Sequence, residues 1–172
     1  MLSQFSGAIL NDERTHRFLL WRFWDERPKM LFIGLNPSTA NELQDDPTVR
    51  RLCGFARDWG YGGLYVCNVF SQVTPNPRQL IGAHHPADWH TLQMAMELTT
   101  LSVCGWGDGI AKAAYGFSRA NTVRNTLRKP MCFGLTSQGN PRHPLYLPKE
   151  AELEPLHELK QAMIAQNAWF EP

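Results

Sequence analysis

Short apolar runs alternate with amphipathic segments along most of this chain. The apolar runs, each bounded by proline, glycine or polar residues, predict strands buried on both faces over residues 30–35, 64–70, 101–107 and 131–135. Apolar residues at helical spacing predict helices over residues 48–59, 86–100, 118–128 and 149–166. Aromatic rings mixed with arginines make residues 12–24 fit an edge strand about as well as a helix.

This alternation predicts an α/β fold with a single domain over residues 1–172, in three layers (α/β/α) around a central, mainly parallel sheet. No internal repeat or linker-like segment divides the chain. Ligands of such sheets bind outside the carboxyl ends of the strands. We therefore expect the loops that follow the four strands to converge there, namely residues 36–47, 68–77, 105–109 and 136–147.

The loop after the first apolar run begins Asn36-Pro37-Ser38-Thr39. The Asn36 amide is suited to orienting a water molecule or a polar ligand edge, and the two hydroxyls can bind a ligand. The same tetrapeptide is also ordinary turn chemistry. Asp46, at the start of the next predicted helix, fits a helix cap as well as a ligand contact. All five residues are candidates for the site.

The last loop combines hydroxyl, amide, guanidinium and imidazole groups on a segment stiffened by two prolines. Arg142 is suited to pairing with a phosphate, and His143 to stabilising an oxyanion or to acid–base chemistry near neutral pH. A solvated arginine and a surface histidine are the alternative interpretation. Thr136 and Asn140 in the same loop are candidate substrate-binding residues.

Asn68 ends an otherwise apolar strand, where an unpaired buried amide costs about 1–3 kcal/mol. It is therefore either a structural hydrogen-bonder that ties loops together or a ligand contact. The glycine-rich residues 105–109 lack the spacing of known nucleotide-binding loops. Four basic residues on or beside the third predicted helix form a solvated face or contact phosphates: Arg119, Arg124, Arg128 and Lys129.

The amino-acid composition limits the kinds of partner that we expect this protein to bind. A formal net charge of +1 over 172 residues gives no strong overall field to recruit nucleic acid or a membrane, although a local basic patch remains compatible with it. No stretch approaches the roughly 20 apolar residues that span a bilayer, and no secretory signal is recognisable, so we expect a cytoplasmic protein. The four cysteines are widely spaced in apolar contexts, which favours reduced, buried thiols. We expect no metal and no cofactor.

Several motifs taken together resemble an uncharacterised family of bacterial and phage proteins, catalogued as a domain of unknown function. They are the aromatic and arginine pattern of residues 17–24, LNPSTA (35–40), DDPT (45–48) and PRHPLY (141–146). The resemblance covers residues 14 to 148, with the helix over 149–166 outside it. Val73 and Ser137 stand where that family commonly has a basic residue, and this weakens an argument for phosphate binding.

A more distant resemblance is to the uracil-DNA glycosylase superfamily. Gly34-Leu35-Asn36-Pro37, Asn68 at a later strand end and His143-Pro144 follow the order of its motifs. The resemblance implies a uracil-DNA-glycosylase-like fold and a hydrolase of an N-glycosidic bond in a nucleotide or modified base. By it, Asn36 positions the hydrolytic water, Asn68 reads the base edge and His143 stabilises the departing base. Asn36 and His143 are thus the candidate catalytic residues.

Two other interpretations stay open. A non-catalytic module that binds a nucleotide, nucleobase or nucleic acid needs the same pocket without the chemistry. An interaction protein would instead use the aromatic N-terminal segment, with Trp21, Phe23 and Trp24, as a surface for a partner.

Overall fold

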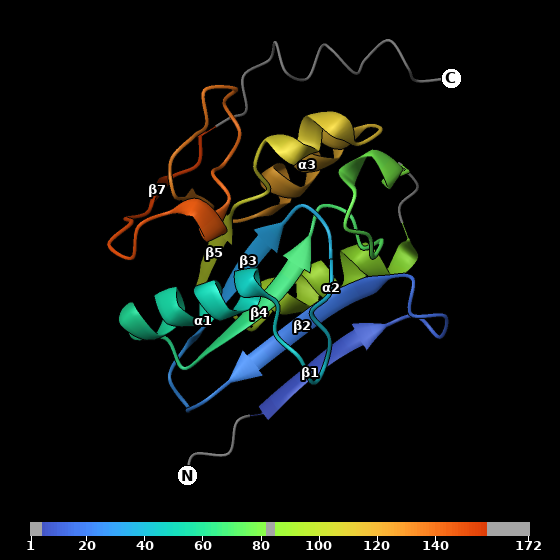
Figure 1. Cartoon of the computed structure of the whole chain (residues 1–172). Helices are drawn as coiled ribbons and strands as arrows, with labels where there is room; N and C mark the ends of the chain where they lie inside the picture. Colours follow the sequence, from blue (N-terminus) through green and yellow to red (C-terminus); the bar gives the residue numbers. More distant parts are fainter. Residues whose placement is uncertain (1–4, 82–84, 158–172) are drawn as a thin grey trace.

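The computed structural model describes residues 5–81 and 85–157 as one α/β arrangement of seven strands and three α-helices (Figure 1). The strands form a single mixed sheet in the order β1-β2-β4-β3-β5-β6-β7. Their bounds are β1 (Phe5–Leu10), β2 (Arg17–Phe23), β3 (Lys29–Gly34), β4 (Gly63–Asn68), β5 (Leu101–Cys104), β6 (Met131–Cys132) and β7 (Glu154–Pro155).

The four predicted strands form the parallel centre of the sheet, with β4, β3, β5 and β6 side by side. The register pairs Gly34 with Asn68 and Ile33 with Cys104, so the carboxyl ends of three strands lie level. The prediction of a mainly parallel sheet needs correction, because three of the six strand pairings are antiparallel. Residues 11–16 join β1 to β2 as a hairpin, since parallel neighbours need a crossover of a dozen or more residues.

Residues 17–23 of the segment over 12–24 form a strand rather than a helix, but the prediction of an edge strand is wrong. β2 lies between β1 and β4, with β1 at the edge of the sheet. Ser6 and Gly7 interrupt the apolar residues of β1, so no continuous apolar run indicated this strand. A Cβ at Gly7 would lie 2.1 Å from the Trp21 ring, so glycine is required where β1 passes over that indole.

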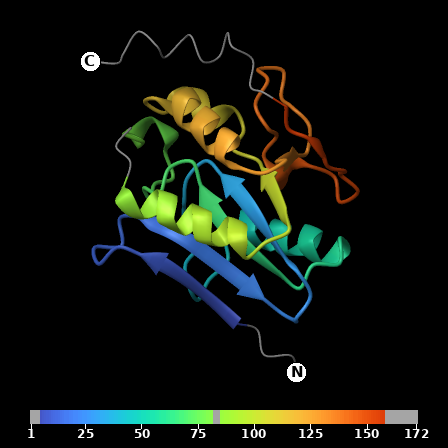
Figure 2. The same ribbon diagram turned by 180° about the vertical axis from the view of Figure 1, so that it is seen from behind.

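Helices cover the two faces of the sheet in three layers (Figures 1 and 2). α1 (Pro47–Asp58) buries Val49 and Leu52 against one face, where Phe32 of β3 packs. α2 (Pro86–Glu97) and α3 (Gly116–Thr126) bury their apolar residues against the other face, where Ile33 packs. The alternation of Phe32 and Ile33 between faces follows from the twofold side-chain period of a strand.

The C-terminal prediction fails in the part of it that the structure describes. Residues 149–157 contain the short strand β7 and no helix, and residues 158–166 lie outside the described residues. The Leu156 amide donates to the Pro130 carbonyl, so this segment joins the sheet edge instead. Proline at 155 lacks the backbone donor that a helix interior needs. Strands β5 and β6 also end earlier than predicted, the second just before Gly134 at a φ of +87°.

Candidate functional site

A cavity of about 580 Å³ opens at the carboxyl ends of β3, β4 and β5. The chain leaves β3 toward α1 on one face of the sheet and leaves β5 toward α3 on the other. Such a switch in direction creates a crevice where α/β proteins bind ligands. The cavity receives residues from all four strand-end loops. Its polar lining comprises Arg17, Asn36, Ser38, Asp46, Thr48, Asn68, Thr74, Asp108, Lys112, His143 and Tyr146.

Two glycines permit close packing at the strand ends. A Cβ at Gly34 would lie 2.8 Å from the Asn68 amide oxygen, and a Cβ at Gly105 would lie 2.8 Å from the Phe32 ring. The absence of side chains at both positions lets Asn68 and Phe32 lie directly beside neighbouring strands. Phe32, although almost fully buried, thereby reaches the apolar part of the cavity wall.

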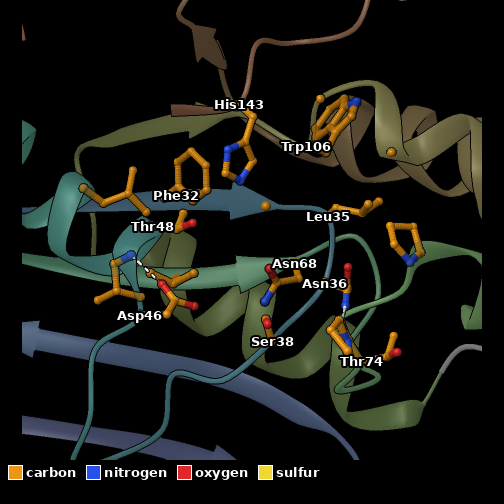
Figure 3. Close-up of a pocket in the computed structure, with 18 of the residues that line it drawn as sticks. Phe32, Leu35, Asn36, Ser38, Asp46, Thr48, Asn68, Thr74, Trp106 and His143 are labelled. Carbon is orange, nitrogen blue, oxygen red and sulfur yellow. Dashed lines mark hydrogen bonds between the residues drawn. The ribbon is translucent and has the colours of Figure 1, made fainter. Parts of the chain in front are cut away.

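Asn36 is anchored by its amide nitrogen. Its Nδ2 donates to the Pro37 carbonyl at 2.8 Å and to the Thr74 carbonyl at 2.6 Å, which ties the loop after β3 to the loop after β4. Both amide protons are thereby used, and the side chain can only accept further hydrogen bonds. Figure 3 shows the amide nitrogen turned toward Thr74 and the oxygen turned away from it. Asn36 therefore offers the cavity an acceptor of fixed orientation.

Asp46 combines the two roles that its sequence position left open. Its Oδ1 accepts a hydrogen bond from the Val49 amide at 2.8 Å, so it is the N-cap of α1, with Pro47 in the first turn. Its other carboxylate oxygen has no protein donor among the described residues, and the residue lines the cavity. One oxygen thus holds the helix while the other faces the cavity.

Asn68, the last residue of β4, also lines the cavity. Its Nδ2 is buried and has no acceptor in the part of the chain that the structure describes. Leaving a buried donor without a partner costs about 1–3 kcal/mol, and such groups are rare in native structures. This amide is therefore an unsatisfied polar group at the wall of a ligand-sized cavity.

His143 enters the cavity from the last loop (Figure 3). Its Nδ1 accepts from the Leu145 amide at 3.3 Å, so the proton of the neutral imidazole is on Nε2. Burial lowers the pKa of His143, and the Asp46 carboxylate opposes this shift. The ring is consequently neutral near pH 7 and presents an N–H donor. Figure 3 shows Asn36, Asn68 and Asp46 on the side of the cavity opposite His143.

Of the remaining predicted residues, Ser38 lines the cavity and the others do not. Pro37 is buried beside the cavity, and Thr39 and Arg142 are exposed outside its lining. Thr136 Oγ1 and Asn140 Nδ2 both donate to Asp108 Oδ1, at 2.7 Å each. These two side chains therefore hold the last loop to the loop after β5, and neither is in the cavity lining.

Residue patterns missed Arg17, Thr48, Trp106 and Asp108 as parts of this site. For Arg17 the sequence did contain a signal. Arg17 directly precedes an apolar run, and a charged side chain that is buried beside such a run needs a reason to be there. Asp108 was visible only as part of a glycine-rich turn.

The basic residues beside α3 do not form a solvated face at Arg119. That side chain is buried and forms an ion pair with Asp88 at 3.2 Å.

Within residues 5–81 and 85–157, no three cysteine, histidine or acidic side chains lie close enough together to hold a metal ion. All four cysteines are free and buried, and burial raises the pKa of Cys53 to about 11 and that of Cys67 to about 12. No helix in the described part of the chain is long and apolar enough to cross a bilayer.

The aromatic N-terminal segment does not present three exposed rings. Trp24 is only 8% exposed, and Trp21 and Phe23 are half-buried, with Phe5 stacked beside both. Among the described aromatic residues of β1 and β2, the exposed ring is Phe5. A partner surface built from Trp21, Phe23 and Trp24 together therefore has no support from this arrangement.

Among the comparisons with known proteins, the one with protein-family models gives a match. A family model described as "Protein of unknown function (DUF1643)" matches residues 17–145, close to the 14–148 expected from the motifs. Neither the curated proteins nor the solved structures give a match. The resemblance to uracil-DNA glycosylases therefore stays a prediction.

Proposed function

The chain belongs to the DUF1643 family, whose description assigns no activity. From the residues of the cavity, we propose that the protein hydrolyses an N-glycosidic bond. The substrate is a nucleotide or a nucleoside with a modified base. One observation carries the proposal: the His143 donor and the Asn36 acceptor lie on opposite sides of one cavity.

Displacement at the anomeric carbon needs this opposed arrangement. The water oxygen forms a bond to the carbon on one side while the carbon–nitrogen bond breaks on the other. The departing base keeps the electron pair of the broken bond and carries developing negative charge. A donor on the base side and an acceptor on the water side therefore both lower the barrier.

His143 acts on the base side in this scheme. Its neutral ring has Nε2–H directed into the cavity because the Leu145 amide occupies Nδ1. A fixed donor that faces developing negative charge stabilises the transition state without reorganisation. The lowered pKa keeps the ring in this neutral form at physiological pH.

Asn36 and Asp46 act on the water side. The Asn36 oxygen orients the water. The Asn36 side chain is itself held in place because its nitrogen donates to two backbone carbonyls. The free oxygen of Asp46 takes the proton that the water loses, since its partner oxygen is already fixed by the helix cap. Carboxylates positioned in this way contribute about 10²–10⁴-fold as general bases.

The size and the walls of the cavity suit a base with its sugar. A volume of about 580 Å³ lies within the usual range of small-molecule sites, which is roughly 300–1,000 Å³. Phe32 and Trp106 supply apolar wall, and Asn68 supplies an amide nitrogen, without an acceptor among the described residues, for the polar edge of a base. The net charge of +1 favours a small substrate over an extended duplex, which requires many phosphate contacts.

The experiment that tests this proposal is base release. Purified protein is incubated with nucleosides, nucleotides and oligonucleotides that contain modified bases, and free base is measured by chromatography. We expect release from at least one compound and its loss in Asn36→Ala, with Thr39→Ala as a matched loop control because Thr39 is exposed outside the cavity lining. Compounds that raise the melting temperature but stay intact would favour the binding-module alternative, and no release across the panel contradicts the proposal.

A further inference from the structure

Arg17 is a buried cation at the wall of the cavity. Its residue is 3% exposed, and its Nη1 donates to the Ala40 carbonyl at 2.7 Å. Its Nε is enclosed by protein and has no acceptor in the part of the chain that the structure describes. Within the described residues, Nη1 has a hydrogen-bond partner and the other two side-chain nitrogens of Arg17 have none. No carboxylate of these residues lies within 4.0 Å of the guanidinium.

The other buried arginines of the described chain are neutralised. Arg22, on the same strand, has Nε 2.7 Å from the Asp45 carboxylate, and Arg119 lies 3.2 Å from Asp88. A buried charge without a partner is costly, so proteins rarely retain one without use. Burial lowers the pKa of Arg17 to about 10, which still leaves the guanidinium charged at neutral pH. Arg17 therefore differs from Arg22 and Arg119 in lacking an anion.

The partner that would satisfy the Arg17 guanidinium is an anion that accepts two hydrogen bonds. A guanidinium presents parallel N–H groups that match two oxygens of a phosphate, and this pairing is stronger than a bond to a neutral carbonyl. The Asp46 carboxylate opposes the lowering of the Arg17 pKa, but among the described residues it forms no ion pair with Arg17. Lys112, exposed at the end of the turn after β5, adds a second cation to the same lining.

We propose that Arg17 binds a phosphate monoester of the substrate, which makes the substrate a nucleotide rather than a nucleoside or a base within duplex DNA. This inference rests on the proposed function, because the glycosidic bond and the phosphate belong to one molecule in one cavity. It reassigns the phosphate contact from Arg142, which is exposed outside the lining, to Arg17.

The test compares each nucleoside with its own 5′-monophosphate. Binding of adenosine, guanosine, cytidine, uridine and their monophosphates is measured by calorimetry on the full chain, with inorganic phosphate as a competitor. We expect at least one monophosphate to bind about ten- to a hundredfold more tightly than its nucleoside, the usual effect of a charge-assisted contact. Inorganic phosphate should compete for the monophosphate.

Variants then assign the effect to Arg17. Arg17→Met should remove the advantage of the monophosphate, so that each nucleoside and its monophosphate bind the variant with similar affinity. Arg17→Lys, which keeps a point charge without the planar fork, should retain part of the advantage. Arg128→Met is the matched control, since Arg128 is an exposed arginine outside the cavity lining. Should Arg17→Met fail to fold, the wild-type pairs and the lysine variant carry the test.

The outcomes separate this inference from the proposed function. Monophosphates that bind through Arg17 but stay intact would overturn the hydrolase and support the phosphate site. Nucleosides that bind and are cleaved as well as their monophosphates would support the hydrolase and overturn the phosphate site. Equal losses for both ligands in Arg17→Met, or no binding of any monophosphate at millimolar concentration, would also overturn it.

Discussion

The first and the last strand-end loops have similar polar compositions but use their side chains differently. The loop over 36–47 directs Asn36, Ser38 and Asp46 into the cavity. The loop over 136–147 contributes His143 and the rim residue Tyr146, while Thr136 and Asn140 bind Asp108. The count of polar residues in a loop therefore did not indicate how many of them would face a ligand.

The reason for this difference lies in how each loop is anchored. The first loop is fixed largely from outside the cavity, by Arg22, which donates to the Asn41 and Gln44 carbonyls and forms an ion pair with Asp45. An arginine also reaches the last loop, since Arg51 donates to the Leu147 carbonyl at its end. The side chains of Thr136 and Asn140, however, are held from within, by the Asp108 carboxylate. Side chains are available for chemistry only where other groups satisfy the backbone and hold the loop.

The largest effect that we expect comes from the last loop. His143→Gln should lower the rate of base release by about 10²–10⁴-fold, because the fixed donor to the leaving base is lost. Steady-state rates on the best compound of the base-release panel measure the effect, with Arg142→Gln as the control because Arg142 is exposed outside the lining. Similar rates in the two variants would mean that the last loop has only a structural role.

The next effect concerns the first loop. Asp46→Asn keeps a good helix cap, since asparagine and aspartate cap equally well, but removes the carboxylate. We expect base release to fall by about 10²-fold or more while the free energy of unfolding changes by less than about 0.5 kcal/mol. Urea unfolding and release rates measured on one preparation separate the two. A loss of stability without a loss of rate would leave Asp46 as a cap alone.

Much of this arrangement could be predicted from residue patterns. α1 begins one residue before the predicted helix, and the predicted strand ends bring Asn36, Asn68 and Asp46 to one cavity. These predictions hold because apolar periodicity and caps are local signals.

Arg17 and Asp108 could not be placed in this way. Whether Arg17 reaches the cavity depends on β2 lying next to β4 in the sheet, which is set by long-range pairing. Asp108 gains its role only when residues 136–140 lie beside it. The parallel content was overestimated for the same reason, since the β1–β2 hairpin depends on a strand without a continuous apolar run.

A smaller effect tests the anchoring of the last loop. Asp108→Ala leaves the Thr136 and Asn140 donors without their acceptor, and we expect the free energy of unfolding to fall by about 2–4 kcal/mol. Asp108→Asn retains an oxygen acceptor for both donors, so its loss should be less than half as large. Chemical denaturation of both variants measures this. Equal losses would show that the charge of Asp108, rather than its two hydrogen bonds, anchors the loop.

The smallest effect is a dependence of stability on pH through His143. Because its pKa is lowered in the folded protein, the unfolded chain binds a proton that the folded chain does not, between that lowered value and the ordinary 6.5. Stability due to His143 is therefore fully present above pH 6.5 and is lost as the pH falls through the folded pKa. Urea unfolding of the wild type and His143→Gln from pH 5 to 8 isolates this contribution, since the other titrating groups are common to both. We expect the wild type to lose more stability on acidification than the variant; parallel curves would mean that the Asp46 carboxylate offsets the burial of the ring, and that His143 is not held neutral by the fold.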